Sequence, residues 1–274
     1  MVVLLCPVRG CGEPLARGAR AFVCARGHSF DRARSGYCNL LQPQDRRSKE
    51  PGDPREAVLA RRRFLDAGHG GLLLGALREL IPIVPIVPGG LAVLDLGCGE
   101  GFYLGNLSSE RPIEGYGLDI STTAVDLAAR RYPDVCWLVA NADRVLPFAG
   151  ASFDLVLSLT ARRNAPEARR VLRPDGRLIV AVPGEDDLIE AREAVLGEGV
   201  VRSRVDGVLA DFAHFTVESH RTLHRRELLD AAAIRDALAA TYRGVRDSER
   251  RRLDEITAMD ITLSYDLLIF RLRR

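Results

Sequence analysis

The stretch VLDLGCGEG at positions 93–101 constrains the fold of this chain more than any other feature. Apolar residues and one acid lead into glycines at alternate positions, and a helical run follows at 102–107. This order predicts a buried strand, a tight turn and the start of a helix. Gly97 and Gly99 carry no Cβ, so the backbone can approach a ligand closely. The free N–H groups of the helix start then favour a cofactor site at this turn.

The spacing of these glycines separates two cofactor classes. Dinucleotide enzymes use G-x-G-x-x-G, whereas this chain has G-x-G-x-G with Asp95 at the strand end. The pattern resembles motif I of the class I S-adenosyl-L-methionine-dependent methyltransferases. Two more elements of that family follow in order: GYGLDIS at 115–121 and VANAD at 139–143. The resemblance implies cofactor contacts from Asp95, Gly97, Cys98, Gly99, Gly101, Asp119, Ile120, Asn141 and Asp143.

The rest of the chain alternates in the manner of an α/β protein. Strands are expected near 92–96, 115–119, 135–139, 154–159 and 177–182, with helices near 101–108, 122–131 and 165–172. Such alternation predicts a parallel sheet covered by helices on both faces. Before this region, helices are expected at 54–68, with Asp53 as the cap, and at 72–81. After it, we expect a helix near 185–196, a strand near 214–222, a helix near 226–240 and a strand near 259–272. The family resemblance implies a Rossmann-like seven-stranded sheet with one antiparallel strand.

Three cysteines and a histidine near the N-terminus have the spacing of a metal site. Cys6, Cys11, Cys24 and His28 form a C-x4-C-x12-C-x3-H pattern. Zinc prefers four tetrahedral sulfur or nitrogen ligands, and a segment of this size is too small to be held by core burial alone. We therefore predict a structural Zn²⁺ at these residues. The alternative is free cysteines, which is the expected state of Cys38, Cys98 and Cys136.

Positive charge is concentrated in the first quarter of the chain. Residues 1–63 hold thirteen Arg or Lys and six Asp or Glu, an excess of +7, although the whole chain carries only +2. This asymmetry favours a nucleic-acid partner, and a merely solvated basic surface is the alternative. The candidate phosphate contacts are Arg46, Arg47, Arg61, Arg62 and Arg63.

Several motifs together resemble one family, the 23S rRNA guanine-N1 methyltransferases, which include macrolide-resistance enzymes. They are the zinc knuckle, GHSFD at 27–31, GY-x-NLL at 36–41, ARRRFLDAGH at 60–69 and the methyltransferase core. The resemblance adds His69 to the expected cofactor residues, and the loop ARRNAPE at 161–167 is similar to the resistance branch. This chain departs from the family pattern at two places. The first two metal ligands of the family are spaced C-x2-C, whereas Cys6 and Cys11 are spaced C-x4-C, and the family's tyrosine after Gly68-His69 is replaced by Gly70.

The end of the fourth expected core strand, at 158–164, is the predicted place for the acceptor base, because ligands meet parallel sheets at the carboxyl ends of their strands. Asn164 is the candidate that hydrogen-bonds the flipped base, and a helix cap before Pro166 is its alternative. Arg162 and Arg163 are further candidates for phosphate contacts or ordinary surface charges. The sequence identifies no general base.

The expected organisation is a zinc-binding RNA-recognition module at 1–35, a basic linker with helices at 36–90 and a methyltransferase domain at 91–274. The resemblance implies methylation of guanine N1 in a hairpin of 23S rRNA, and a homodimer is kept open. No apolar run is long enough to span a bilayer, so we expect a cytoplasmic protein without a membrane partner. Two alternatives remain: a small-molecule methyltransferase of natural-product metabolism, and an RNA-binding protein with a degenerate methyltransferase core.

Overall fold

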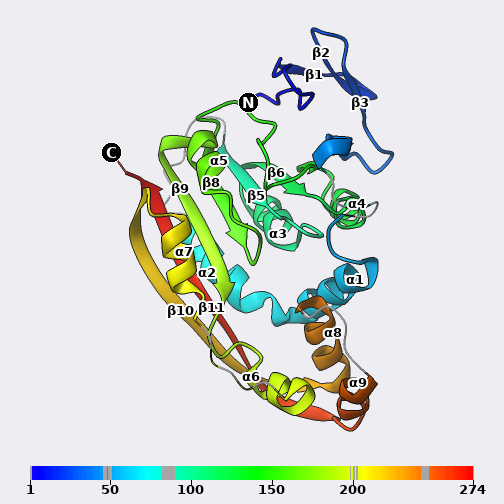
Figure 1. Cartoon of the computed structure of the whole chain (residues 1–274), viewed down its shortest axis with the longest axis vertical. Helices are drawn as coiled ribbons and strands as arrows, with labels where there is room; N and C mark the ends of the chain where they lie inside the picture. Colours follow the sequence, from blue (N-terminus) through cyan, green and yellow to red (C-terminus); the bar gives the residue numbers. More distant parts are fainter. Residues whose placement is uncertain are drawn as a thin grey trace.

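The computed structural model describes residues 2–45, 48, 51–81, 90–197, 199, 201, 203–241 and 247–273. Two sheets organise these residues: a three-stranded sheet near the N-terminus and an eight-stranded sheet that forms the body (Figure 1). None of the helices in these ranges is long and apolar enough to cross a membrane.

The main sheet confirms the expected α/β class. Its order is β10-β11-β9-β8-β5-β6-β7-β4. The strands are β4 (Cys38–Asn39), β5 (Leu91–Leu96), β6 (Ile113–Asp119), β7 (Cys136–Val139), β8 (Phe153–Leu159), β9 (Leu172–Pro183), β10 (Phe215–Asp230) and β11 (Ala258–Leu272). β11 runs antiparallel to both of its neighbours, while the strands from β9 to β4 pair in parallel.

The eighth strand corrects the expected count of seven. β4 comes from the stretch expected to be a linker, and its two residues pair in parallel with Leu138 and Val139 of β7. A strand of this length is too short to show a period-2 pattern, which explains why the sequence did not reveal it.

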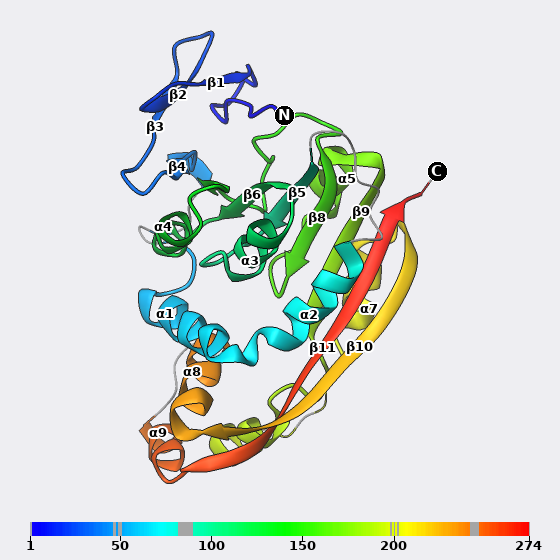
Figure 2. The ribbon, with the colours of Figure 1, turned by 180° about the vertical axis from the view of Figure 1, so that it is seen from behind.

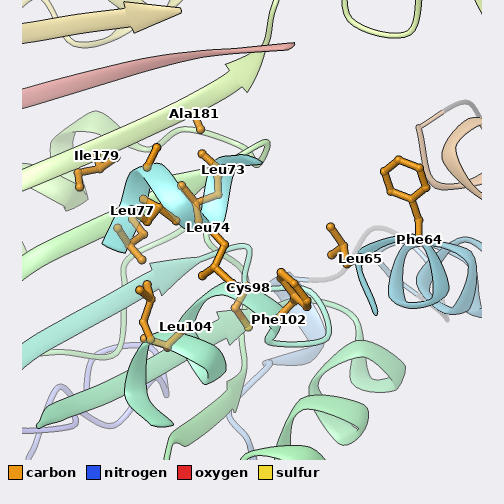
Figure 3. Packing of buried hydrophobic residues seen from close by; sticks show 14 of the residues in the cluster. Phe64, Leu65, Leu73, Leu74, Leu77, Cys98, Phe102, Leu104, Ile179 and Ala181 are labelled. Atoms are coloured by element: carbon orange, nitrogen blue, oxygen red, sulfur yellow. The ribbon is translucent and has the colours of Figure 1, made fainter. Parts of the chain in front are cut away.

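Helices cover both faces of the sheet, which buries alternate residues of each strand in different cores. The helices are α1 (Arg55–Phe64), α2 (Gly71–Leu80), α3 (Phe102–Glu110), α4 (Thr122–Arg131), α5 (Ala165–Val171), α6 (Ile189–Ala191), α7 (Val205–Asp211), α8 (Ala231–Thr241) and α9 (Asp247–Asp254). Val93 of β5 packs in the core that includes α2, α3, α4 and α8, whereas Leu94 packs in the core that includes α5 and α7. Figure 3 shows Leu73, Leu74 and Leu77 of α2 inserted beside Ile179 of β9.

Two π-helical turns continue helices, η2 (Leu65–His69) after α1 and η4 (Arg192–Leu196) after α6, and a 3₁₀ turn, η1 (Pro43–Asp45), follows β4. The expected helix at 54–68 is therefore α1 plus η2. Its expected cap is wrong, since Pro54 occupies the N-cap position without a side-chain bond. Ser121 caps α4 by accepting a hydrogen bond from the Ala124 N–H.

The C-terminal third departs most from expectation. β10 runs to Asp230, well beyond the expected strand end, so α8 begins only at Ala231. β10 is an edge strand that pairs with β11 along most of its length, and most of its residues are exposed or half-buried. Charged and polar residues on both faces hide the strand periodicity, so the stretch LHRRELLD at 223–230 resembles a helix in sequence. α7 and α9 were not expected.

The N-terminal sheet consists of β1 (Leu15–Arg17), β2 (Ala21–Cys24) and β3 (Ser29–Asp31), which pair antiparallel. It lies at one end of the body, beyond the starts of β6 and β8 (Figure 2). The contacts agree with this placement: the Val2 N–H donates to Glu114 at the beginning of β6, and Leu4 forms a bridge with Phe148. The zinc-binding segment therefore sits at the end of the sheet where the parallel strands start.

Candidate active site and metal centre

A cavity of about 570 Å³ lies at the carboxyl ends of the central strands. Asp95 is the last residue but one of β5, Asp119 ends β6, Asn141 follows β7 and Thr160 follows β8, and all four line the cavity. Strand ends of a parallel sheet are the usual ligand position in open α/β folds. The structure thus brings together the first three cofactor motifs, as the sequence predicts, at the end of the sheet opposite the N-terminal module.

The glycine turn has the backbone that the sequence requires. Gly97 has φ 75°, and a Cβ there would lie 2.5 Å from the Ala161 side chain. Gly99 has φ 56° and donates its N–H to Asp119 Oδ2 at 3.0 Å. Both positions therefore need glycine, one because of space and conformation and the other because of conformation alone.

Asp119 organises the turn from the neighbouring strand. Its Oδ1 accepts the Ser121 N–H at 2.8 Å, and its Oδ2 accepts the Gly99 N–H. Burial raises the pKa of Asp119, and the two backbone bonds oppose that rise. The carboxylate holds two loops together in the cavity wall, where Ile120 lies beside it.

Two further carboxyl groups leave buried oxygens without partners among the described residues. Asp95 Oδ1 and Glu100 Oε2 receive no hydrogen bond from them, and both residues are almost fully buried. Burial raises the pKa of Asp95 to about 8, with a further contribution from the charges of Asp119 and Glu100. An acidic, partly unsatisfied wall suits a cationic ligand. S-adenosylmethionine, with its sulfonium and ammonium groups, has that charge.

Arg61 provides a cation in this wall, a role that sequence reasoning missed. Its guanidinium donates to Asp53 Oδ2 at 2.8 Å and to the Ala240 carbonyl at 3.3 Å. Despite burial, the carboxylates of Glu100 and Asp53 raise the pKa of Arg61. Sequence spacing shows only that three consecutive arginines point in different directions, so the inward-facing one could not be singled out.

The segment after β4 lines the cavity together with the residues that follow β7. Asn141 Nδ2 donates to the Asp45 carbonyl at 2.7 Å, and Asn141 Oδ1 accepts the Asp143 N–H at 2.9 Å. Gly52 lies so close to Ser121 that a Cβ would approach its side chain to 2.7 Å. Asn141 therefore positions backbone around the cavity as well as lining it.

The four expected metal ligands converge. The ligand atoms of Cys6, Cys11, Cys24 and His28 all lie within 4.8 Å of one another. Cys11 Sγ and Cys24 Sγ are 3.8 Å apart, close to the ~3.8 Å expected between sulfurs of a tetrahedral site with Zn–S bonds of ~2.3 Å. His28 Nδ1 lies 3.4 Å from Sγ of both Cys6 and Cys24. The donor set and its spacing fit a closed structural zinc site.

Family models match both parts of the chain. Residues 4–49 match the family described as "RlmA, N-terminal", a zinc ribbon, and residues 94–180 match the family described as "Methyltransferase domain". The second range holds all three cofactor motifs.

Full-length relatives decide the family. The "23S rRNA (guanine(748)-N(1))-methyltransferase" of Streptomyces fradiae is 34% identical over 275 residues, covering 98% of this chain and 96% of the relative. A protein of Bacillus subtilis named as a putative 23S rRNA (guanine-N(1)-)-methyltransferase, YxjB, is 31% identical and covers 96% of this chain and 95% of its own. The chain belongs to the 23S rRNA (guanine-N1)-methyltransferase family.

A solved structure supports the fold of this family member. The methyltransferase in a complex with the Haloferax volcanii Trm112 activator superposes with a TM-score of 0.53 at 21% identity, covering 82% of this chain and 100% of that one. The body is thus a class I methyltransferase fold. S-adenosylmethionine is its cofactor, and zinc is the structural metal of its N-terminal ribbon.

Three expected site residues of this methyltransferase do not line the 570 Å³ cavity. His69 is outside the cavity and its Nδ1 is 2.6 Å from Glu227 Oε2 of β10. Gly101 is the N-cap of α3, where a Cβ would lie 2.6 Å from Trp137, so its role is packing. Asn164 is the N-cap of α5, the alternative left open by the sequence.

The details at Asn164 explain this reassignment. Its Oδ1 accepts the Glu167 N–H, and its Nδ2 donates to the carbonyls of Ala142 and Arg144 at 2.8 and 3.0 Å. Both ends of the amide are already bound to the backbone. Both hydrogens of the amide nitrogen are thus used in backbone hydrogen bonds, and a role of Asn164 at the acceptor base stays a prediction.

Four of the candidate RNA-binding arginines of this methyltransferase each form an ion pair with an acidic residue. Arg62 pairs with Asp66, Arg63 with Asp236, Arg162 with Asp143 and Arg163 with Asp211. Arg162 is the most exposed of these four, with 79% of its side chain accessible. Arg46 and Arg47 lie outside the described residues.

The departure at Gly70 also has a packing reason. A Cβ at Gly70 would lie 2.7 Å from Phe102 and 2.8 Å from Leu65. Figure 3 shows Phe102 and Leu65 facing one another in this region. Phe102 thus occupies the space beside the turn, which leaves no room for a larger residue at position 70.

Proposed function

We propose that this protein transfers the methyl group of S-adenosylmethionine to N1 of a guanine in a hairpin of 23S rRNA. Near-full-length similarity to enzymes named for that reaction is the observation that carries the proposal. The intact glycine turn and Asp119 favour an active enzyme over a degenerate core, because both have the conformation that cofactor binding needs.

The distance between the two sites supports an extended substrate. The zinc ribbon contacts Glu114 at the start of β6, and the cofactor cavity includes Asp119 at its end. A strand of seven residues spans about 20 Å. A substrate that touches both must be a macromolecule such as an RNA hairpin, and a small-molecule acceptor needs no ribbon.

We assign the methionine end of the cofactor to the wall formed by Asp95, Glu100 and Arg61. The unpaired oxygens of the two acids can accept from an ammonium, and Arg61 can donate to a carboxylate. Asp119 faces the ribose, and Asn141 and Asp143 border the adenine. The cofactor supplies the electrophilic methyl group; the protein supplies orientation and excludes water.

We further propose the division into residues 1–35 for RNA recognition, 36–90 for linking and covering the cofactor, and 91–274 for methyl transfer. β4 at Cys38–Asn39 adds to the sheet of the third part, so the linker is structurally fused to it. The homodimer remains an expectation of the sequence alone. The loop at 161–167 favours a role in macrolide resistance.

Methyl transfer to defined acceptors tests this function. Purified protein is incubated with methyl-labelled S-adenosylmethionine and either 23S rRNA or a panel of small acceptors. Label in 23S rRNA, located at guanine N1 by nuclease digestion and mass spectrometry, supports the proposal. Label only in small acceptors would establish the small-molecule alternative, and cofactor binding without transfer would indicate a degenerate core.

A further inference from the structure

A second cavity, of about 320 Å³, continues from the cofactor cavity. The two share Asp53, Arg61, Leu65, Tyr103 and Thr160 in their walls. Arg61, one of these shared residues, belongs to the wall that we assign to the methionine end of the cofactor. The second cavity therefore opens where the reactive methyl group would be presented. Its volume is at the lower end of the ~300–1,000 Å³ usual for small-ligand sites, which suits a single base.

The walls of this cavity are apolar on two sides. Ala57 and Phe64 come from α1, Ala237 from α8 and Leu263 from β11. The α1 and α8 sides are tied together because Arg61 donates to the Ala240 carbonyl. Flat apolar walls can hold the faces of an aromatic base extruded from its stack.

Backbone strain is concentrated at the same cavity. Among the described residues, the non-glycine residues with positive φ are Ala151, Thr160 and Leu188. Two of them, Thr160 (φ 53°) and Leu188 (φ 55°), line this cavity. Strained non-glycine residues of this kind gather at functional sites. Leu188 directly follows Asp187, which also lines this cavity.

Asp187 is one of two carboxylates that line this cavity, and the other is Asp53, which pairs with Arg61. The Oδ1 of Asp187 accepts the Ser264 N–H at 2.9 Å, while its Oδ2 accepts no hydrogen bond from the described residues. Tyr103 and Tyr265 line the same cavity. Asp187 thus has one oxygen fixed by the backbone and one available to a ligand.

We propose that the second cavity receives the flipped target guanine and that Asp187 accepts its N1 proton during methyl transfer. This inference rests on the proposed function. The N1–H bond breaks and its proton goes to the Asp187 carboxylate, which becomes a carboxylic acid. The freed electron pair on N1 forms the new bond to the methyl carbon. The bond between that carbon and sulfur breaks, its electrons stay on sulfur, and S-adenosylhomocysteine leaves.

The environment of Asp187 agrees with this role. Burial raises the pKa of Asp187 to about 6, against the opposing effects of the Ser264 N–H, Arg204 and Arg192. At neutral pH the group is therefore still ionised, yet it is a stronger base than an ordinary aspartate. A positioned base of this kind contributes about 10²–10⁴-fold to rate.

The variant Asp187→Asn tests the proton acceptor, because an amide oxygen still accepts the Ser264 N–H but cannot take a proton. Single-turnover transfer to 23S rRNA is measured with both substrates saturating. We expect the rate to fall about 10²–10⁴-fold, while the Kd values for S-adenosylmethionine and rRNA stay within about twofold. Asp186→Asn is the matched control: its carboxylate binds Ser264 Oγ and His224 outside the cavity, and its rate should stay near the parent's.

A second variant keeps the proposal testable if Asp187→Asn does not fold. Ala57→Leu adds bulk to the second cavity only, so it should abolish transfer without changing cofactor affinity. Parental rates in Asp187→Asn would overturn the proton-acceptor role, and parental rates in Ala57→Leu would overturn the base site. Failure of the parent itself to methylate guanine N1 of 23S rRNA would instead refute the proposed function.

Discussion

Replacing Asp95 by asparagine should stabilise the cofactor-free protein, and the gain should grow with pH. Asp95 is only 2% exposed, and its Oδ1 has no partner among the described residues. In the unfolded chain its carboxyl ionises above about pH 4. In the folded chain burial and the nearby charges of Asp119 and Glu100 hold its pKa at about 8. The unfolded state therefore binds fewer protons between these values, and this residue lowers stability as pH rises.

The size of the effect follows from the two pKa values. Each pKa unit corresponds to ~1.4 kcal/mol, so the cost of Asp95 is roughly 1.5 kcal/mol at about pH 5 and roughly 4 kcal/mol at about pH 7. The asparagine side chain of the variant does not titrate. The stability difference between Asp95→Asn and the parent should thus shift in favour of the variant by about 2–3 kcal/mol across this interval.

Urea unfolding followed by circular dichroism at the two pH values measures this shift. Asp126→Asn is the matched control, because hydrogen bonds from Arg130 and Ser35 lower the pKa of Asp126. The difference in unfolding free energy between Asp126→Asn and the parent should be the same at both pH values, since Asp126 is ionised in the folded and in the unfolded state. A pH-independent difference for Asp95→Asn as well would refute the account of the acidic cavity wall.

Three further changes test the sites. Cys24→Ser should reduce bound zinc from one ion per chain to none, and rRNA binding should disappear while the core keeps its cofactor affinity; stoichiometric zinc by mass spectrometry in this variant would reject the ligand set. Asp119→Ala should weaken S-adenosylmethionine binding by roughly 1.5–3 kcal/mol, which unchanged calorimetric affinity would contradict. Replacing Arg46 and Arg47 by alanine should lower the log–log salt slope of rRNA binding by about 0.7–0.9 for each phosphate that is no longer neutralised; an unchanged slope would show that these arginines are solvated surface.

The glycine turn of the cofactor site was predictable because the residues that form it are consecutive in the sequence. The run from Asp95 to Gly101 predicts a strand, a turn and a helix, and the structure has β5, the turn and α3 there. The zinc ligands were predictable for the same reason, since two short loops each carry two ligands close together in the sequence. The four ligand atoms lie within 4.8 Å of one another.

Residues whose role depends on distant contacts were not predictable. Arg61 was expected to meet RNA, but it faces Asp53 and the cofactor cavity. His69 was expected at the cofactor, but it pairs with Glu227, a partner on a strand far along the chain. Asp187 was not among the candidates, because it accepts the N–H of Ser264, a residue far along the chain. Sequence spacing cannot report such long-range placements.

Locating the methyl group on 23S rRNA tests the central claim most directly. The protein is expressed in a host that lacks a related enzyme, and the rRNA is digested and analysed by mass spectrometry beside rRNA from the host alone. The account predicts one additional methyl group, on N1 of a guanine within a hairpin, and its absence in a strain expressing Asp187→Asn. An additional methyl group on another atom or another RNA, or none in the parent, would contradict it.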